Sequence, residues 1–163
     1  MPASRALPKT NKARAVRESQ ATYLSSEPPK QLRYLLDTNI CIYIAKHAPV
    51  SVRERFAEHT AAELAMSVIT YGELCFGVQK SVAKSKAQHL LAQLNQTIEV
   101  CPLPDHAGEH YGDIRAHLEK KGQVIGNNDL WIAAHARANG WILVTNNEKE
   151  FKRVPKLQIE NWV

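Results

Sequence analysis

The sequence predicts an α/β fold in three layers, with a short parallel sheet flanked by helices. From Arg33 onward, short apolar runs alternate with segments whose apolar residues recur at helical spacing, which is typical of β-α-β units. The composition is that of an ordinary globular protein, with 44% hydrophobic and 23% charged residues. The 163 residues are enough for one domain that folds around a single core.

The first 31 residues differ from the rest of the chain. They contain four prolines and no periodic apolar pattern, so they cannot bury enough surface to order themselves. Six Lys and Arg against two Glu give this segment a charge of +4 out of the total of +5, which leaves +1 for the remainder. We therefore predict a disordered basic extension over residues 1–31 and one folded domain over residues 32–163. The sequence leaves open whether the extension attracts RNA, reflects an upstream start of translation, or is simply a tail.

The first predicted unit is a strand followed by two short helices. The apolar run at residues 34–36 ends at Asp37-Thr38-Asn39, and helical spacing then continues to Lys46. A second helix is expected over residues 50–57, because Val52 and Phe56 lie four residues apart on one face.

The second predicted unit is a strand over residues 64–69 and a pair of helices. Residues 70–73, Thr-Tyr-Gly-Glu, match a capping box that would open a helix reaching about Gly77. A longer amphipathic helix follows, and its expected buried residues are Ala83, Ala87, Leu90, Leu91 and Leu94.

The remaining elements alternate in the same way. A strand at residues 98–101 precedes a helix whose apolar stripe runs from Ala107 to Leu118 and which ends at Gly122. Asn127 and Asn128 are good N-caps for a helix over residues 130–139, which Gly140 would terminate. Strands are then expected at residues 141–144 and 157–159.

Four polar residues stand where strands meet helices. Asp37 ends the first strand, Glu73 opens the helix after the second, Asp129 opens the helix before the fourth, and Asn147 follows that strand. In an open parallel sheet, these positions border one crevice. Carboxylates gathered there would repel each other unless a cation lay among them, and oxygen ligands suit Mg²⁺ or Mn²⁺. Taken singly, each acid also has a structural interpretation: Glu73 could bond Thr70, Asp37 could cap its helix, and Asp129 could lie in a first turn because helix dipoles favour anions there.

Four segments, in this order, resemble the PIN domain and, within it, the VapC toxin family. They are Y-L-L-D-T-N at 34–39, S-V-I-T-Y-G-E-L at 67–74, I-G-N-N-D-L-W-I-A-A-H-A at 125–136 and L-V-T-N-N-E-K-E-F at 143–151. The resemblance spans residues 33–163 and has no counterpart for the N-terminal extension.

The resemblance assigns roles to the polar residues. Asp37, Glu73 and Asp129 would be the catalytic residues and metal ligands, with Thr38 and Asn39 orienting Asp37 and Thr145 near the substrate phosphate. Many PIN domains have a fourth acid where this chain has Asn147, which puts a tightly held second ion in doubt. Glu148 and Glu150 are expected on the surface of the following helix.

The resemblance also implies a function. The protein would be a Mg²⁺-dependent endoribonuclease that cuts tRNA or ribosomal RNA through metal-activated water. It would form a homodimer and be silenced by a VapB-type antitoxin. No window approaches the roughly 18 consecutive apolar residues of a membrane span, so we expect a cytoplasmic protein that does not enter membranes.

Several alternatives stay open at this stage. With Asn147, the chain could be a catalytically weak PIN domain that binds RNA or protein. A phosphatase with Asp37 as nucleophile would want a second aspartate where Asn39 stands. Two further patterns have both a functional and a structural interpretation. The histidines at 106, 110 and 117 could bind zinc or border the core, and the lysines at 80, 84 and 86 could meet phosphates or form a solvated face.

Overall fold

The computed structural model describes residues 33–163, and the predicted N-terminal extension lies outside them. Five parallel strands form one sheet in the order β3-β2-β1-β4-β5. The strands are β1 (Tyr34–Leu36), β2 (Leu64–Ser67), β3 (Glu99–Cys101), β4 (Ile142–Val144) and β5 (Ile159–Glu160). The helices are α2 (Thr38–Ala45), α3 (Val50–Ala57), the 3₁₀ turn η1 (Ala61–Glu63), α4 (Val68–Lys80), α5 (Lys84–Thr97), α6 (Ala107–Lys120), α7 (Asn127–Asn139) and α8 (Glu148–Phe151).

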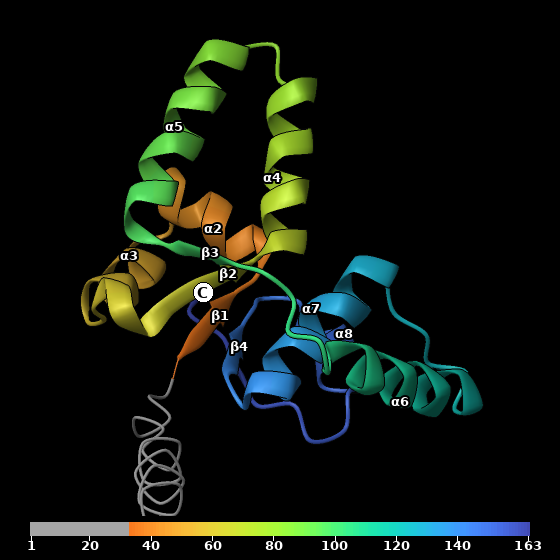
Figure 1. Ribbon diagram of the computed structural model, residues 1–163. Coiled ribbons are helices and arrows are strands. Elements are labelled where there is room, and N and C mark those ends of the chain that lie inside the picture. Colours follow the sequence, from red (N-terminus) through yellow and green to blue (C-terminus); the bar gives the residue numbers. More distant parts are fainter. Residues whose placement is uncertain (1–32) are drawn as a thin grey trace, which may run out of the picture. The chain divides into compact units, whose positions relative to one another are not determined.

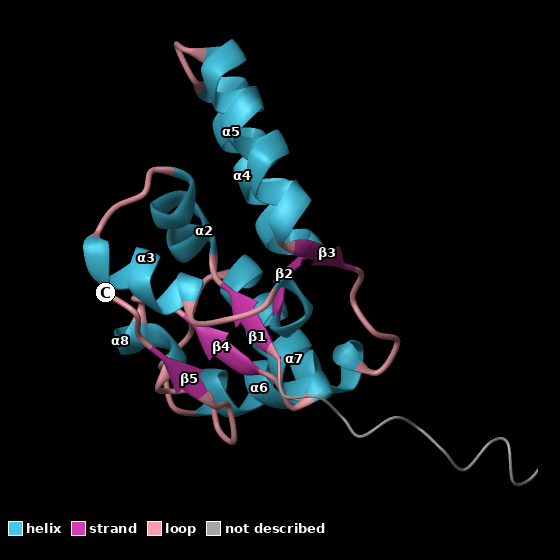
Figure 2. Cartoon of the chain, turned by 90° about the vertical axis from the view of Figure 1, so that its left-hand side faces the viewer, coloured by secondary structure: helices cyan, strands magenta, loops and turns pink. Residues whose placement is uncertain are grey.

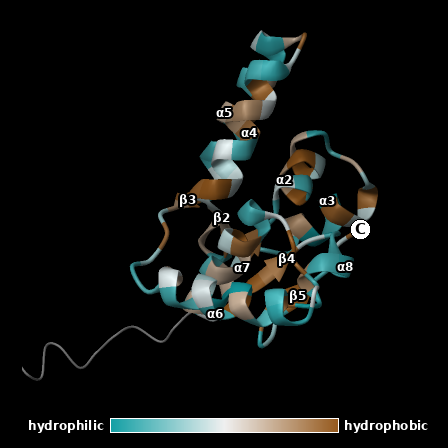
Figure 3. Ribbon diagram, turned by 90° about the vertical axis from the view of Figure 1, so that its right-hand side faces the viewer, coloured by the Kyte–Doolittle hydropathy of each residue, from teal (hydrophilic) through white to brown (hydrophobic). Residues whose placement is uncertain are grey.

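Two apolar clusters, one on each face of the sheet, confirm the three-layer prediction. Successive side chains of a strand point to opposite faces, and in β1 Leu35 joins the cluster that contains α6 and α7 while Leu36 joins the one that contains α2 and α3. Leu143 and Val144 divide in the same way in β4. Figure 2 shows the strands edge to edge with helices on both sides, and Figure 3 shows β4 as a hydrophobic ribbon while α8 is hydrophilic.

Helices α4 and α5 form an antiparallel hairpin that extends away from the sheet (Figure 1). Of the apolar residues expected to be buried on α5, only Leu94 is, at 6% exposure. Leu90 and Leu91 are half-buried and line an apolar groove of about 290 Å³ between α2, α4 and α5. The hairpin therefore leaves part of its apolar side uncovered.

The predicted helix starts were wrong at two places that matter for the site. Strand β2 ends at Ser67 and α4 begins one residue later, because the Ser67 hydroxyl caps the helix by accepting from the Ile69 N–H at 3.2 Å. The expected capping box at Thr70 does not form, and Glu73 lies in the second turn of α4. Helix α7 begins at Asn127, with Gly126 in the cap position that was predicted for the asparagines.

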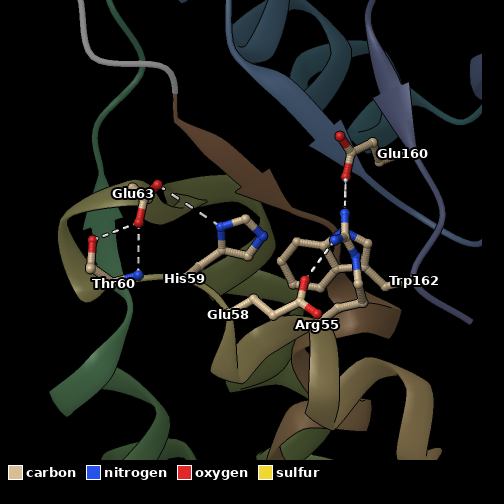
Figure 4. Close-up of polar contacts among 7 residues, drawn as sticks. All are labelled: Arg55, Glu58, His59, Thr60, Glu63, Glu160 and Trp162. Carbon is tan, nitrogen blue, oxygen red and sulfur yellow. Dashed lines mark hydrogen bonds and ion pairs between the residues drawn. The ribbon is translucent and has the colours of Figure 1, made fainter.

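The C-terminal residues fasten to α3 and to the segment before β2 (Figure 4). Trp162 is 2% exposed and its ring stacks on His59 at 5.3 Å between centroids. Arg55 bridges to Glu160 at 3.1 Å, and its guanidinium lies 5.9 Å from the Trp162 ring centroid. These contacts hold β5 at the edge of the sheet beside β4.

No helix between residues 33 and 163 is long and apolar enough to cross a membrane.

Candidate metal-dependent nuclease site

Asp37 lies directly after the central strand and is almost fully buried, at 5% exposure. Its backbone N–H continues the sheet by donating to the Val144 carbonyl at 2.9 Å. One carboxylate oxygen caps α2 by accepting from the Thr38 N–H at 2.7 Å, and the other accepts from the Thr145 hydroxyl at 2.8 Å. Burial raises the pKa of Asp37, the two hydrogen bonds partly counter it, and the Glu73 carboxylate raises it further. A negative charge here is therefore held in place but poorly neutralised.

Glu73 joins two helices that come from distant parts of the chain. Its carboxylate accepts hydrogen bonds from the Thr38 hydroxyl on α2 and from the Asn128 side-chain amide on α7, the latter at 2.9 Å. Thr38 thus contacts both acids, through its N–H and through its hydroxyl. The predicted capping role for Glu73 was wrong, because its oxygens point across the crevice and not back to Thr70.

Asp129 stands in the first turn of α7, beside Gly126. A Cβ built on Gly126 would lie 3.0 Å from an Asp129 carboxylate oxygen, so a larger residue here would push this carboxylate aside by a few tenths of an ångström. Burial raises the pKa of Asp129 to about 7, with further contributions from a hydrogen bond to Glu150 and from the charge of Asp37. Asp129 therefore has the most strongly raised pKa of these acids, because burial and neighbouring carboxyl groups leave its negative charge poorly compensated.

Glu150 is a fourth acid that the sequence interpretation misplaced. It was expected on the surface of α8, but its carboxyl group lies near enough to that of Asp129 to contribute to the raised pKa of Asp129. Glu148 does match the prediction, since it pairs with Lys152 and accepts from Asn161 at 2.8 Å. A carboxyl group near Asp129 is therefore present three residues beyond Asn147.

A crevice of about 730 Å³ brings the predicted residues together. Its walls are Asp37, Thr38, Asn39, Ile69, Gly72, Glu73, Phe76, Asn128, Asp129 and Asn147. Asn39 is exposed there, and the hydrogen bonds of Asp37 come from Thr38 and Thr145, so the orienting role of Asn39 stays a prediction. Thr145 is fully buried behind Asp37, out of reach of a substrate phosphate, and the Asn147 N–H donates to its hydroxyl at 2.9 Å.

The histidines at 106 and 110 and a nearby aromatic pair receive structural interpretations. The Arg137 guanidinium donates to His110 at 2.9 Å, and a His106 ring nitrogen lies 3.1 Å from the Ala138 carbonyl oxygen. Trp131 stacks on Tyr111 at 4.1 Å between centroids. These side chains therefore have partners within the fold, away from the acidic crevice.

Comparison with known proteins agrees with this geometry. The PIN domain family model matches residues 34–157. The chain belongs to the PIN domain family. Among relatives of this PIN domain, ribonuclease VapC2 of Haemophilus influenzae is 43% identical over 133 residues, which cover 81% of this chain and 99% of the relative. A tRNA(fMet)-specific endonuclease VapC of Salmonella typhimurium is 40% identical over 131 residues, which cover 80% and 98%.

Solved structures place the same PIN domain among VapC nucleases. The VapBC2 complex of Rickettsia felis, bound to a DNA fragment from its promoter, matches with a TM-score of 0.76 and 42% identity over 81% of this chain and all of the other. The DNA-bound VapBC complex of Salmonella typhimurium matches with a TM-score of 0.77 and 39% identity over 82% and 100%. The protein is a PIN-domain nuclease of the VapC type.

The acids of this PIN domain fit a divalent cation by their chemistry. Asp37, Asp129 and Glu150 are hard oxygen donors, and two of them have raised pKa values because their charge is poorly compensated. In the part of the chain that the structure describes, no three acidic, histidine or cysteine side chains converge tightly enough to hold an ion as they stand. The Glu73 carboxylate is held by hydrogen bonds from Thr38 and Asn128.

Proposed function

We propose that the protein is a Mg²⁺-dependent endoribonuclease, able to use Mn²⁺, whose cation is held by Asp37, Asp129 and Glu73 with the help of Glu150. The observation that carries this proposal is the gathering of Asp37, Glu73 and Asp129 around one crevice at the carboxyl ends of β1, β2 and β4, with Glu150 near Asp129. When bound, the cation polarises a phosphoryl oxygen and offsets the charge that builds up during phosphodiester hydrolysis.

The chain's own residues prepare this site. Thr145 and the Thr38 N–H fix both oxygens of Asp37, so that its carboxylate presents one orientation to the crevice. The Thr38 hydroxyl and Asn128 do the same for Glu73. Such fixed acids lose little freedom when a cation and a phosphate enter, which is how preorganisation lowers a barrier.

The first experiment is RNA cleavage by purified protein with Mg²⁺, with Mn²⁺ and with EDTA. Asp37→Ala, Asp129→Ala and Glu150→Gln should each abolish discrete cleavage. The matched control is Glu148→Gln, because Glu148 lies on the same short helix but pairs with Lys152, and it should cleave as the wild type does. Wild-type cleavage by Glu150→Gln would remove Glu150 from the site. Absence of cleavage by folded wild-type protein would favour the weak PIN domain that binds RNA or protein.

We further propose that tRNA is the substrate and that a VapB-type antitoxin is the partner. The relative named as a tRNA(fMet)-specific endonuclease supports the first, and the VapBC complexes among similar structures support the second. The apolar groove between α2, α4 and α5 shares Glu73 with the acidic crevice. An antitoxin segment in this groove could therefore bring an Arg or Lys to the carboxylates, which would form charge-assisted hydrogen bonds.

Purified initiator tRNA, elongator methionine tRNA and ribosomal RNA distinguish the substrates when offered at equal concentration. We expect cleavage of the initiator tRNA first. Equal cleavage of all three would contradict a tRNA-specific enzyme without contradicting ribonuclease activity. Sedimentation of the protein alone tests the homodimer, which stays a prediction.

A further inference from the structure

One wall of the crevice contains an aromatic side chain that the proposed hydrolysis does not use. Ile69, Gly72, Glu73 and Phe76 all line the crevice from α4. Their spacing of three and four residues places them on one helix face. Phe76 is 64% exposed there, although the other lining residues are mostly polar. A large ring left open beside acids that cut a polymer is available to contact that polymer.

The surroundings of Phe76 suit a ligand that has a flat ring and, next to it, a negatively charged group. A Cβ built on Gly72, one turn before Phe76, would have no atom within 4 Å, so the surface between them is open. Lys80 lies one turn after Phe76, with its ammonium 5.3 Å from the ring centroid. Lys80 is exposed, and no carboxylate of residues 33–163 forms a salt bridge with it. An ammonium occupies one face of a ring and leaves the other free.

Charge argues for a nucleic acid as the occupant. Asp37, Glu73, Asp129 and Glu150 give the crevice a negative potential that repels phosphates, so an RNA strand needs cationic contacts on the way in. Lys80 supplies such a contact, since it lies on the same helix as Glu73 and Phe76, one turn beyond Phe76. The interval from Phe76 to Lys80 is about one helical turn, or 5.4 Å, a distance that one nucleotide spans.

We propose that Phe76 and Lys80 form a nucleotide-binding subsite, in which a base next to the scissile phosphodiester stacks on Phe76 and its phosphate meets Lys80. The inference rests on the proposed ribonuclease activity and adds the feature that receives the strand. Stacking on an aromatic ring tolerates every base, because each base has a π-face. Phe76 is thus a positioning residue that contributes affinity and leaves the choice of sequence to other groups.

The test measures binding separately from cleavage. The probes are fluorescein-labelled oligoadenylate RNA and an abasic strand of the same length, about 12 nucleotides, within the usual range of single-strand site sizes. Ca²⁺ replaces Mg²⁺ to restrain cleavage, and a gel verifies that the strands stay intact. The variants are Phe76→Ala, Phe76→Trp and Lys80→Ala. The matched controls are Val82→Ala and Lys120→Ala, at exposed positions outside the crevice.

Phe76→Ala should raise the Kd for oligoadenylate about tenfold, equivalent to about 1.4 kcal/mol. Its Kd for the abasic strand should stay within about twofold of the wild-type value. Phe76→Trp should restore the wild-type Kd. Lys80→Ala should weaken both strands equally, since it loses a phosphate contact, and both controls should bind as the wild type does. In cleavage assays, Phe76→Ala should raise KM and leave kcat unchanged.

Several outcomes would overturn the subsite. They are an unchanged Kd in Phe76→Ala, an equal loss on the two strands, or a loss of antitoxin binding or of the oligomeric state with RNA affinity intact. The last would assign Phe76 to a protein interface. Base-dependent binding without any cleavage would instead contradict the ribonuclease proposal and leave the subsite standing, so the two failures are distinguishable.

Discussion

The buried side chain of His135 should make the protein less stable in mild acid than at neutral pH. It lies on α7 with 0% exposure, one ring nitrogen 3.1 Å from the Ser67 hydroxyl and the other without a partner. Burial lowers the pKa of His135 to about 4, from 6.5 in an unfolded chain. Between these values the unfolded chain binds more protons, so stability is complete above about pH 6.5 and declines as the pH falls towards 4.

The size of this effect follows from the two pKa values. Linkage between 6.5 and about 4 gives a loss of about 2–3 kcal/mol on going from pH 7.5 to pH 4.5. The variant His135→Phe keeps an aromatic ring beside Trp141, whose centroid lies 5.6 Å away, and removes the titrating group. We expect the free energy of unfolding of the variant to lie within about 1 kcal/mol of the wild-type value at pH 7.5. The variant loses one hydrogen bond, which destabilises it, but it also loses a buried nitrogen without a partner, which offsets that cost.

The assay is urea unfolding of both proteins at several pH values, followed by tryptophan fluorescence. Carboxylates titrate in the same range, but they do so in both proteins, so the difference between the two curves isolates His135. At pH 4.5 the free energy of unfolding of the variant should exceed that of the wild type by about 2–3 kcal/mol. Parallel curves across the whole range would refute the reasoning and mean that the ring accepts a proton in the folded state without penalty.

Three further predictions concern the surroundings of the acids and the C-terminus. Gly126→Ala should lower kcat about 10- to 100-fold with little change in melting temperature, because its Cβ would displace the Asp129 carboxylate; wild-type kinetics would show that the carboxylate is free to move. Thr145→Val should lower the free energy of unfolding by about 1–3 kcal/mol and weaken Mn²⁺ binding by calorimetry, because it removes a donor from the buried Asp37; unchanged Mn²⁺ affinity would count against Asp37 as a ligand. Trp162→Ala should cost about 3–5 kcal/mol in urea unfolding and leave the kcat of the folded protein unaltered, since its ring is buried outside the crevice; a matching fall in kcat would mean that the C-terminus acts on the site.

The sequence predicted the sheet and the three acids because both follow from short-range patterns. Buried parallel strands read as apolar runs, and polar residues at their carboxyl ends border one crevice wherever the helices lie. The starts of α4 and α7 were harder to predict. Ser67 and Gly126 each competed with a reasonable cap a few residues on, and the choice between them depends on packing that no local pattern contains.

Glu150 shows most clearly what the sequence could not settle. Two residues in a helix are rotated by about 200°, so Glu148 and Glu150 cannot both face the crevice, and α8 is too short to have an apolar stripe that would orient it. The orientation is set by Phe151, which is 1% exposed and packs in the core. Phe151 was the one signal that the sequence offered for the orientation of α8. Without the tertiary structure, it does not show which of the two glutamates faces the crevice.

The order of the strands also bears on when the protein becomes active during synthesis. The central strand β1 is the first strand to be made, yet its neighbour β4 and the helix carrying Glu150 come late, with only β5 after them. A nascent chain that has emerged only as far as α6 holds Asp37 and Glu73 but lacks Asp129, and its core strand has an unpaired edge. Since domains fold as units during translation, ribosome-bound intermediates of this chain should be inactive. Nuclease activity then begins only when nearly the whole chain has left the ribosome.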